Sequence, residues 1–424
     1  MKSAPLILSG TLVNHDEMLH GSVHINAETG LIENICGYNP NATIAGDFLI
    51  FPGFVDAHTH LREDTTGTQK YKEDFETGSA AAINGGVVAV GDMANKPLPP
   101  TTREIYGDIV ALTKRASIDI LLYAAIAHGS RPFTFEGQKV PYKGFLAESI
   151  NDLRFTSSSQ AKTTLCHYRG EDVSLHCDDN EVLARCANEA LHEDRRPAES
   201  EIEGIRLAIE MSREFGFALK VVHVSTRKGL ELIEEARRGG LKILAEGTPH
   251  HCGFDRKSLN ENNRKWLQMN PPLRTETDRF AIIRGLATNQ IQFLASDHAP
   301  HTEEEKQGEK GMSGVPHLDT FGAFTTWLMA EHGFCPQDIA RIASYNPGRW
   351  LSKFLPKSPR NRYGYGKIAP GYIGSLTVID PNTPTLVKKE DLKTKCGWSP
   401  FTGKSFPGSV AYTIIRGKIM RGPR

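Results

Sequence analysis

Short apolar runs separated by turn-forming residues occur at both ends of the chain. The N-terminal runs are Leu6–Leu8, Gly21–Ile25 and Leu31–Ile35, and the C-terminal runs are Ser375–Asp380 and Ala411–Arg416. Runs of this length with such flanks are typical of antiparallel strands. We therefore expect residues 1–50 and 356–424 to pair into one small β-sandwich domain.

A different pattern fills residues 51–355. Eight apolar strand-like runs alternate there with stretches of helical periodicity. The runs are residues 51–55, 87–90, 118–126, 140–146, 173–175, 218–222, 241–245 and 291–295. Continuous apolar strands between helices favour a parallel sheet that is covered on both faces. Because eight such units close naturally into a barrel, the pattern predicts an α/β chain built on a (β/α)8 TIM-type barrel.

Composition and charge narrow the class of protein. A chain of 424 residues can hold a barrel, which often takes about 250 residues, and a smaller second domain. The 50 basic and 50 acidic side chains balance, which gives no electrostatic reason to expect nucleic acid or a membrane surface as partner. No stretch approaches the roughly 18 apolar residues of a membrane span, and none resembles a signal peptide. We expect a cytoplasmic protein.

Histidines follow several of the predicted strands. His58 and His60 come directly after the first run, and alternation along an extended chain points both to one face, where they can hold one metal ion. His176, His223 and Asp297 follow the fifth, sixth and eighth runs. One such histidine is more often a hydrogen-bonded structural residue, but several at the rim where barrel active sites lie are hard to explain that way. The set suits a first-row metal, and zinc is the natural expectation.

Lys143 lies late in the fourth run. From spacing alone, a surface lysine is the favoured interpretation. Chemistry offers another, because a lysine desolvated beside cations has its ammonium form disfavoured. The neutral amine can add carbon dioxide to give a carbamate, and that carboxylate-like group could bridge two metal ions.

An ordered set of motifs resembles the dihydroorotases, within the amidohydrolase superfamily. Residues 56–63, DAHTHLRE, are similar to the DxHxHLR(E/D) signature of that family. The likeness continues in residues 72–75, 85–86, 93–95, 195–199, 223–226, 248–251, 270–274, 297–302, 346–347 and 399–401. The ordered set covers most of the chain and is far more specific than any single motif.

The resemblance implies a binuclear zinc site. Its ligands would be His58, His60, Lys143, His176, His223 and Asp297. The HxH pair would hold the more buried ion with Asp297, and the two later histidines would hold the other. Lys143, N-carboxylated by carbon dioxide, would bridge the two ions.

The resemblance also implies a reaction, the reversible hydrolysis of (S)-dihydroorotate to N-carbamoyl-L-aspartate in de novo pyrimidine biosynthesis. Two cations would lower the pKa of a bridging water, which for one zinc already falls to about 7. The hydroxide would attack the ring amide carbon, while Asp297 accepts the proton and returns it to the departing nitrogen as general base and then acid. A homodimer is the assembly that the resemblance suggests.

Five further residues match the family's substrate contacts. Arg62 offers a forked donor suited to the substrate carboxylate, and Asn95 and His301 match the other carboxylate contacts. Asn270 and the backbone near Gly314 would contact the ring. Taken singly, these are ordinary surface, turn and loop residues, and the motif context is what favours a binding role.

The sequence also departs from the family pattern. Lys96 follows Met93-Ala94-Asn95 where relatives have MPNT, which predicts a changed pocket edge, and the stretch Asp64–Lys70 is longer than the usual turn. His176 is followed by Cys-Asp-Asp in place of an HAE-type sequence. Ser149 and Ile150 stand where lysine-type relatives have Thr and Phe, which predicts a weaker grip on substrate if that loop is a lid.

Two other functions remain open at this point. Dihydropyrimidinases, hydantoinases and allantoinases share the metal ligands but lack the trio Arg62, Asn95 and His301. A substrate without a carboxylate would leave that trio unpaired, at about 1–3 kcal/mol per group. A catalytically inactive relative acting as a partner subunit is the second alternative, but such proteins typically lose ligands, and every expected ligand type is present here.

Overall fold

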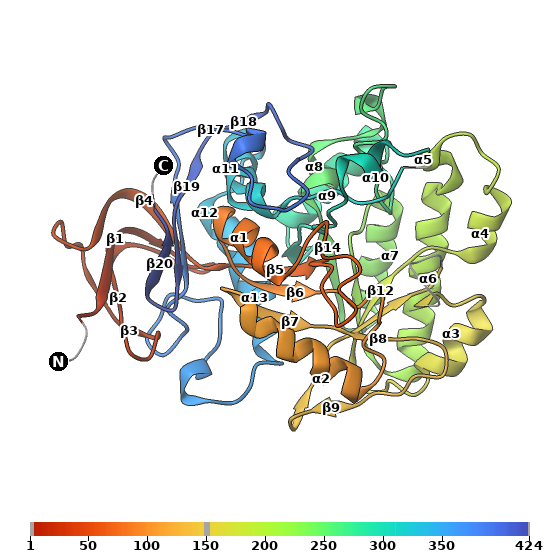
Figure 1. Ribbon diagram of the computed structural model, residues 1–424, viewed down its shortest axis with the longest axis horizontal. Coiled ribbons are helices and arrows are strands. Elements are labelled where there is room, and N and C mark those ends of the chain that lie inside the picture. Colours follow the sequence, from red (N-terminus) through yellow and green to blue (C-terminus); the bar gives the residue numbers. More distant parts are fainter. Residues whose placement is uncertain (1–3, 148–152, 310, 423–424) are drawn as a thin grey trace.

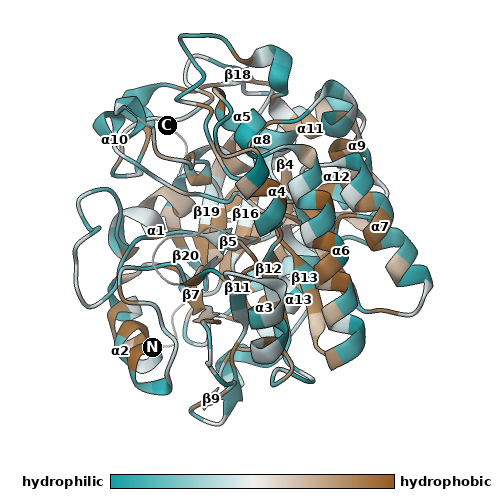
Figure 2. Cartoon of the chain, turned by 90° about the vertical axis from the view of Figure 1, so that its right-hand side faces the viewer, coloured by the Kyte–Doolittle hydropathy of each residue, from teal (hydrophilic) through white to brown (hydrophobic). Residues whose placement is uncertain are grey.

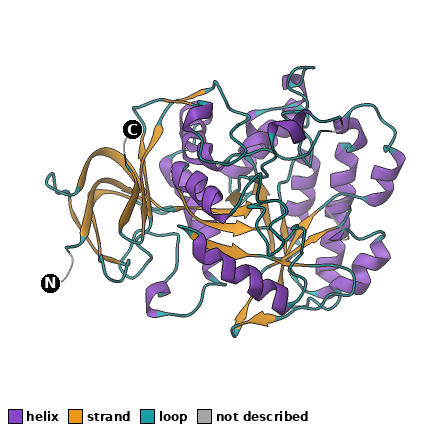
Figure 3. Ribbon diagram, viewed as in Figure 1, coloured by secondary structure: helices purple, strands orange, loops and turns teal. Residues whose placement is uncertain are grey.

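The computed structural model describes residues 4–147, 153–309 and 311–422 (Figure 1). A curved sheet beside the two chain ends adjoins a larger part in which helices surround a set of strands (Figure 3). No helix in the described ranges has the length and apolar character to cross a membrane. The domain boundaries at residues 50 and 355 stay a prediction.

Both chain ends contribute to one seven-stranded sheet. Its strands are β1 (Leu6–Val13), β2 (Met18–Ile25), β3 (Ile32–Gly37), β4 (Ile44–Pro52), β16 (Leu376–Asp380), β19 (Ser409–Ile415) and β20 (Lys418–Arg421). Their order is β20-β19-β16-β4-β1-β2-β3. The two ends meet where β4 and β16 pair antiparallel, with Leu376 opposite Pro52. The expected pairing of the termini is confirmed.

The predicted antiparallel β-sandwich is wrong in two respects. All seven strands belong to one mixed sheet, and β1 runs parallel to β4. The reason lies in β4, part of which the sequence pattern assigned to the first barrel strand. Because β4 lies between β1 and β16, it joins the N-terminal and C-terminal strands into a single hydrogen-bonded ladder. The sheet buries its own apolar cluster, which includes Leu8, Ile50 and Val378.

Each of the eight predicted barrel runs contributes to a parallel strand, although Phe51 and Pro52 of the first run belong to β4. The parallel strands are β5 (Phe54–Thr59), β6 (Val87–Asp92), β7 (Asp119–Leu122) with β8 (Ala124–Ala125), β11 (Tyr142–Phe145), β12 (Asp172–His176), β13 (Ala218–Val221), β14 (Ile243–Gly247) and β15 (Phe293–Leu294). The strands form a three-stranded sheet, β5-β6-β7, and a six-stranded sheet, β15-β14-β13-β12-β11-β8. The mixed α/β architecture is therefore confirmed.

Closure of the barrel differs from the prediction, because hydrogen bonding does not run around a complete ring. Between β7 and β8, the chain changes partners: Tyr123 N donates to Asp92 O (3.0 Å), and Ala124 N then donates to Pro141 O (2.8 Å). At the other seam, an isolated parallel bridge joins Thr59 to His298. The two sheets therefore meet along seams that continuous ladders do not close.

Thirteen α-helices are described, and several of them pack against these strands. The helices are α1 (Phe75–Asn84), α2 (Arg103–Leu112), α3 (Ser158–Leu165), α4 (Asn180–Arg185), α5 (His192–Arg195), α6 (Ala198–Phe215), α7 (Arg227–Arg238), α8 (Pro249–Gly253), α9 (Glu276–Ala287), α10 (Glu303–Gln307), α11 (Phe321–His332), α12 (Pro336–Ile339) and α13 (Asn346–Ser352). Those that pack against the strands include α1, α6, α7 and α9. The remaining short strands are β9 (Thr134–Phe135), β10 (Gln138–Lys139), β17 (Thr385–Leu386) and β18 (Ser405–Phe406).

Helix α7 shows why these segments are helical and which face they bury. Thr226 caps its first turn by accepting from Gly229 N, and Leu230 and Ile233 are buried while charged residues cover the outer face. Figure 2 shows the same division across the molecule, with hydrophobic residues along the central strands and hydrophilic ones on the outer helix surfaces. The helices therefore hold the strands, and the loops after them, in fixed positions.

Thr377 gives a test of how the terminal sheet is joined to the first two barrel strands. Its buried hydroxyl accepts from Phe54 N (2.9 Å) and donates to Gly86 O (2.5 Å). We expect Thr377→Val to lower the free energy of unfolding by about 1–3 kcal/mol, because both partners lose a hydrogen bond inside the protein. Urea denaturation measures this. Exposed Thr383→Val should change it by less than about 0.5 kcal/mol, and an equal effect of both substitutions would contradict this role.

Candidate active site

A single cavity of about 570 Å³ brings together every site residue that the sequence predicts. Those residues are His58, His60, Arg62, Asn95, Lys143, His176, His223, Asn270, Asp297, His301 and Gly314. Most come from the C-terminal halves of the parallel strands or the residues just after them, and Asn270 and Gly314 come from the longer segments that follow β14 and β15. Because all these strands run the same way, residues far apart in sequence reach one end of the barrel.

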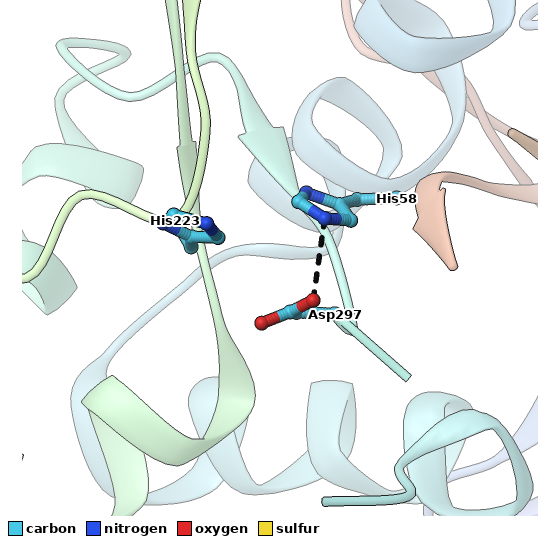
Figure 4. Close-up of side chains that lie close together, drawn as sticks. All are labelled: His58, His223 and Asp297. Carbon is cyan, nitrogen blue, oxygen red and sulfur yellow. Dashed lines mark ion pairs between the residues drawn. The ribbon is translucent and has the colours of Figure 1, made fainter. Parts of the chain in front are cut away.

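The centre of the cavity holds a buried cluster of metal-binding side chains. One ligand atom from each of His58, His223 and Asp297 lies within 4.8 Å of the others (Figure 4). His58 Nε2 is 3.2 Å and His60 Nε2 is 3.1 Å from the same Asp297 Oδ1. Imidazole nitrogens and a carboxylate oxygen converging on one point form a donor set that fits a first-row metal ion such as zinc.

A second pair of imidazoles adjoins this cluster. His176 Nδ1 lies 3.0 Å from His223 Nε2, and the other ring nitrogen of His176 lies 3.0 Å from Asp178 Oδ2. Asp178 is itself held by Arg196 (2.5 Å) and by the Ser200 hydroxyl (2.8 Å). Asp178 therefore fixes the ring so that Nδ1 faces the cluster. The HxD spacing after β12, His176 and Asp178 on one face, is the sequence signal that could have identified this acid.

Lys143 lies inside the protein, so the surface position that spacing alone favours is wrong. Only 1% of the side chain is exposed, and Nζ lies 4.9 Å from the centre of the Phe145 ring. Within the described residues, Nζ has no hydrogen-bond partner. Burial lowers the pKa of Lys143 to about 7. A buried amine without a partner is uncommon, and it fits a lysine whose nitrogen carries an added group.

The electrostatics of the cluster favour neutral imidazoles. Burial, followed by the charge of Lys143, lowers the pKa of His58 well below its usual value. Burial is also the largest cause for His60, where Arg62 adds to it, and for His223. Burial raises the pKa of Asp297. Because a neutral imidazole is the form that binds a metal, the site is prepared for a cation in its centre.

Arg62 and His301 face one side of the cavity. The Arg62 Nη2 atom lies 3.2 Å from His301 Nε2, and since a guanidinium only donates, Nε2 must accept. The opposite nitrogen, Nδ1, then carries the proton and donates to Glu305 Oε2 (3.2 Å). Arg62 Nε has no partner within the described ranges. This buried cation therefore has a donor left over for an acidic ligand.

Gly314 shapes the cavity wall next to His301. It has a φ of +139°, and an added Cβ would lie 2.6 Å from Ala299 O and 3.1 Å from the His301 ring. Only glycine fits both the backbone conformation and this space. Its segment and that of Asn270 line the same cavity.

Three site residues adopt a backbone conformation that side chains rarely take. Arg62, His223 and Asp297 have φ angles of 60°, 39° and 47°. Such conformations cost free energy and persist only where surrounding contacts impose them, often at functional sites. The three strained residues are thus ones whose side chains line the cavity.

Two buried residues beneath the cluster were not anticipated from the sequence. Glu246, at the end of β14, accepts from His58 Nδ1 (2.8 Å) and pairs with Lys220 on β13. Lys220 Nζ also donates to Tyr123 OH (2.8 Å). The carboxylate fixes the tautomer of His58, so that the lone pair of Nε2 faces the cavity. An acid at a strand end beside the predicted ligands was the available signal.

The departures from the family pattern have different outcomes. Lys96 is buried and pairs with Asp92 (2.5 Å), whose other oxygen accepts from Leu61 N (2.8 Å), and Lys96 is not among the described residues that line the cavity. The expected change at the pocket edge is therefore wrong, since Lys96 supports the segment after β5 instead. In the longer stretch, Asp64 accepts from Leu98 N (2.7 Å) and ties that stretch to the loop after β6. Ser149 and Ile150 lie outside the described residues.

Comparison with known proteins gives the context of this site. Residues 49–420 match the sequence model of the amidohydrolase family. A dihydroorotase of Thermococcus kodakarensis is 32% identical, covering 98% of this chain and 94% of its own length. A dihydroorotase of Bacillus subtilis is 29% identical, covering 98% of this chain and 97% of its own length.

Solved structures show the same fold at lower identity. An L-hydantoinase (dihydropyrimidinase) from Arthrobacter aurescens superimposes with a TM-score of 0.87 at 20% identity, covering 99% of this chain and 96% of its own. A dihydropyrimidinase from Brevibacillus agri gives 0.82 at 22% identity, covering 99% and 95%. The arrangement of strands and terminal sheet described above is therefore shared across these proteins.

The Lys220–Glu246 pair gives a test of how the site is supported. Lys220→Met would leave the buried Glu246 carboxylate without its cation, so we expect the free energy of unfolding to fall by about 3–5 kcal/mol. Chemical denaturation measures this. The double variant Lys220→Met with Glu246→Gln should recover most of the loss.

A matched control for this test lies on α7. Lys228 and Glu231 form an exposed pair (3.2 Å), and Lys228→Met should change stability by less than about 0.5 kcal/mol. A small effect of Lys220→Met, or a further loss in the double variant, would contradict the supporting role of the buried pair.

Proposed function

The chain belongs to the amidohydrolase family, and from this premise we propose that it is a dihydroorotase, which hydrolyses (S)-dihydroorotate reversibly to N-carbamoyl-L-aspartate. The observation that carries the proposal is the buried Arg62–His301 pair in the same cavity as the metal-binding cluster. A cyclic amide with a carboxylate suits a site that has a metal-binding cluster on one side and a guanidinium on the other. Full-length relatives named dihydroorotase support the same substrate.

The proposed site would hold two zinc ions. Its ligands would be six residues that line the cavity, with Lys143 N-carboxylated between the two ions: His58, His60, Lys143, His176, His223 and Asp297. Zinc in such a site polarises a carbonyl and lowers the pKa of bound water toward about 7. The partnerless amine of Lys143 and the neutral imidazoles around it are the features of this chain that fit such a site.

The protein's own groups divide the remaining work. Arg62 binds the substrate carboxylate and, with Asn95 and His301, orients the ring so that its amide faces the ligand cluster. Asp297, whose pKa burial raises, would take up a proton from the water whose oxygen bonds to the amide carbon, and would return it to the ring nitrogen as the C–N bond breaks. Asn270 and the backbone at Gly314 bind the ring.

Hydantoinase activity is the second candidate, because the structural neighbours bear that name. It explains Arg62 less well. A hydantoin without an acidic substituent would leave a buried guanidinium donor unpaired in the closed site, at about 1–3 kcal/mol. An inactive partner subunit is disfavoured, since the cavity contains every expected ligand type. A homodimer stays a prediction.

A comparison of substrates tests the proposal. We expect zinc-loaded protein to hydrolyse dihydroorotate and to act on hydantoin and allantoin at least about a hundredfold less efficiently, as loss of two or more paired groups would cause. Turnover of each substrate by the purified protein, with its metal content measured in parallel, decides the matter. Preference for hydantoin or allantoin would sink the proposed substrate.

Asp297 is expected to be needed for turnover more than for metal binding. Asp297→Asn keeps the size and an oxygen donor but cannot take up a proton, so turnover should fall by about 10²–10⁴-fold while most metal is retained. Metal analysis and steady-state kinetics measure both. Asp108→Asn, at an exposed position of α2, serves as control and should leave turnover unchanged. Retained turnover in Asp297→Asn would contradict the proton-transfer role.

Lys143 is expected to hold the second ion. Lys143→Ala should lose at least one metal per chain, and short carboxylic acids such as acetate should partly restore metal and activity by replacing the carbamate. Metal counting with and without the acid measures this. Lys139→Ala, on the exposed strand β10, should keep both ions. Two ions still bound to Lys143→Ala would rule out the bridge.

A further inference from the structure

Helix α10 carries a lysine that the proposed reaction does not use. Lys306 is completely buried, and its ammonium nitrogen donates to three backbone carbonyls. The acceptors are Gln268 O (2.9 Å), Met312 O (2.7 Å) and Gly314 O (3.0 Å). Burial lowers the pKa of Lys306 to about 7. The three carbonyl acceptors around Nζ favour the ammonium form, because only an ammonium has three N–H donors to give them.

The three carbonyls belong to two segments that are separate in sequence and form one wall of the cavity. Gln268 precedes Asn270, and Met312 and Gly314 belong to the stretch 311–314, all of which line the cavity. Lys306 itself is not among the described residues that line it. It therefore lies behind the wall and holds its two halves together.

The surroundings make these hydrogen bonds strong. Lys306 Nζ lies 5.7 Å from the centre of the Trp398 ring, and Trp398 belongs to a buried apolar cluster with Met269 and Val315. In such a low-dielectric environment a charge-assisted hydrogen bond is stronger, and an acceptor that loses its donor is costly. Two hydrogen bonds between neutral groups also join the two segments. Gly314 N donates to Gln268 O (2.9 Å), and Gln268 Nε2 donates to Gly311 O (3.1 Å).

The preceding residue on α10 supports the Arg62–His301 pair. Glu305 accepts from His301 Nδ1 (3.2 Å), and His301 in turn accepts from Arg62 (3.2 Å). Glu305 also pairs with Lys72 (2.9 Å). Adjacent residues of one short helix thus support both the Arg62–His301 pair and the 311–314 stretch.

We infer that Lys306 is a positioning residue for substrate binding, which sets the distance between the Gln268 segment and the 311–314 stretch without touching substrate. The inference rests on the proposed function for the identity of the substrate, because Asn270 and Gly314 are the proposed ring contacts. It predicts an effect on binding rather than on the metal site, since the ammonium contacts none of the proposed ligands.

Lys306→Met keeps the length and bulk of the side chain but removes all three donors. In the zinc-loaded protein we expect KM for dihydroorotate to rise about tenfold or more while kcat and metal content change less than about twofold, because only binding is loosened. Hydrogen exchange at the amides of 311–315, measured without substrate, should accelerate. The exchange measurement does not depend on which cyclic amide the protein hydrolyses. It therefore still tests the role of Lys306 if the proposed function is wrong.

Matched variants keep the test sharp. Lys265 donates to Gln307 O (3.1 Å) and Gly308 O (3.0 Å) at the surface, and Lys265→Met should alter neither KM nor exchange at 311–315. If Lys306→Met does not fold, Gln268→Ala, which removes the tie to Gly311, should still accelerate exchange in that stretch. Unchanged exchange at 311–315, or a fall in kcat that parallels loss of metal, would overturn the inference.

Discussion

The whole site depends on keeping charged and metal-binding groups out of water at the ends of parallel strands. His58, Asp297 and Lys143 are buried together. Burial lowers the pKa of His58 and of Lys143 and raises that of Asp297, so it favours the neutral form of each side chain. Isolated charges in such a place are costly unless opposite charges or hydrogen bonds compensate them. The surrounding residues supply this compensation, and the atoms that face the cavity remain free to bind a ligand.

Compensation comes from paired charges next to the ligands, of which Arg196 also lines the cavity. Glu246 accepts from His58 and is neutralised by Lys220, and Asp178 holds His176 and is neutralised by Arg196. In each case a carboxylate fixes one ring nitrogen, so the other nitrogen faces the metal-binding cluster. Figure 4 shows His58, His223 and Asp297, which come from three different segments and lie close together. The parallel strands supply the positions, and the paired charges supply the orientations.

Much of the fold was predictable because the signal was local. Each barrel strand is a short apolar run between helices, and such a run is buried on both faces wherever it pairs. The terminal sheet was harder. Its strands were recognisable, but whether they form two layers or one depended on β4, which pairs with β1 on one side and with β16, more than 300 residues later in the chain, on the other. Strand pairing across such a distance leaves no local pattern.

The sequence by itself determined which chemistry was available: the HxH pair after the first strand, the later histidines, Asp297 and a lysine in the fourth strand. Only the tertiary structure decided that Lys143 is buried, that Lys96 turns to Asp92, and that Lys306 joins two cavity segments. Residue type sets what a side chain can donate, accept or bind. Burial and partners set its charge and direction, and these arise from segments that are distant in the chain and meet only when it folds.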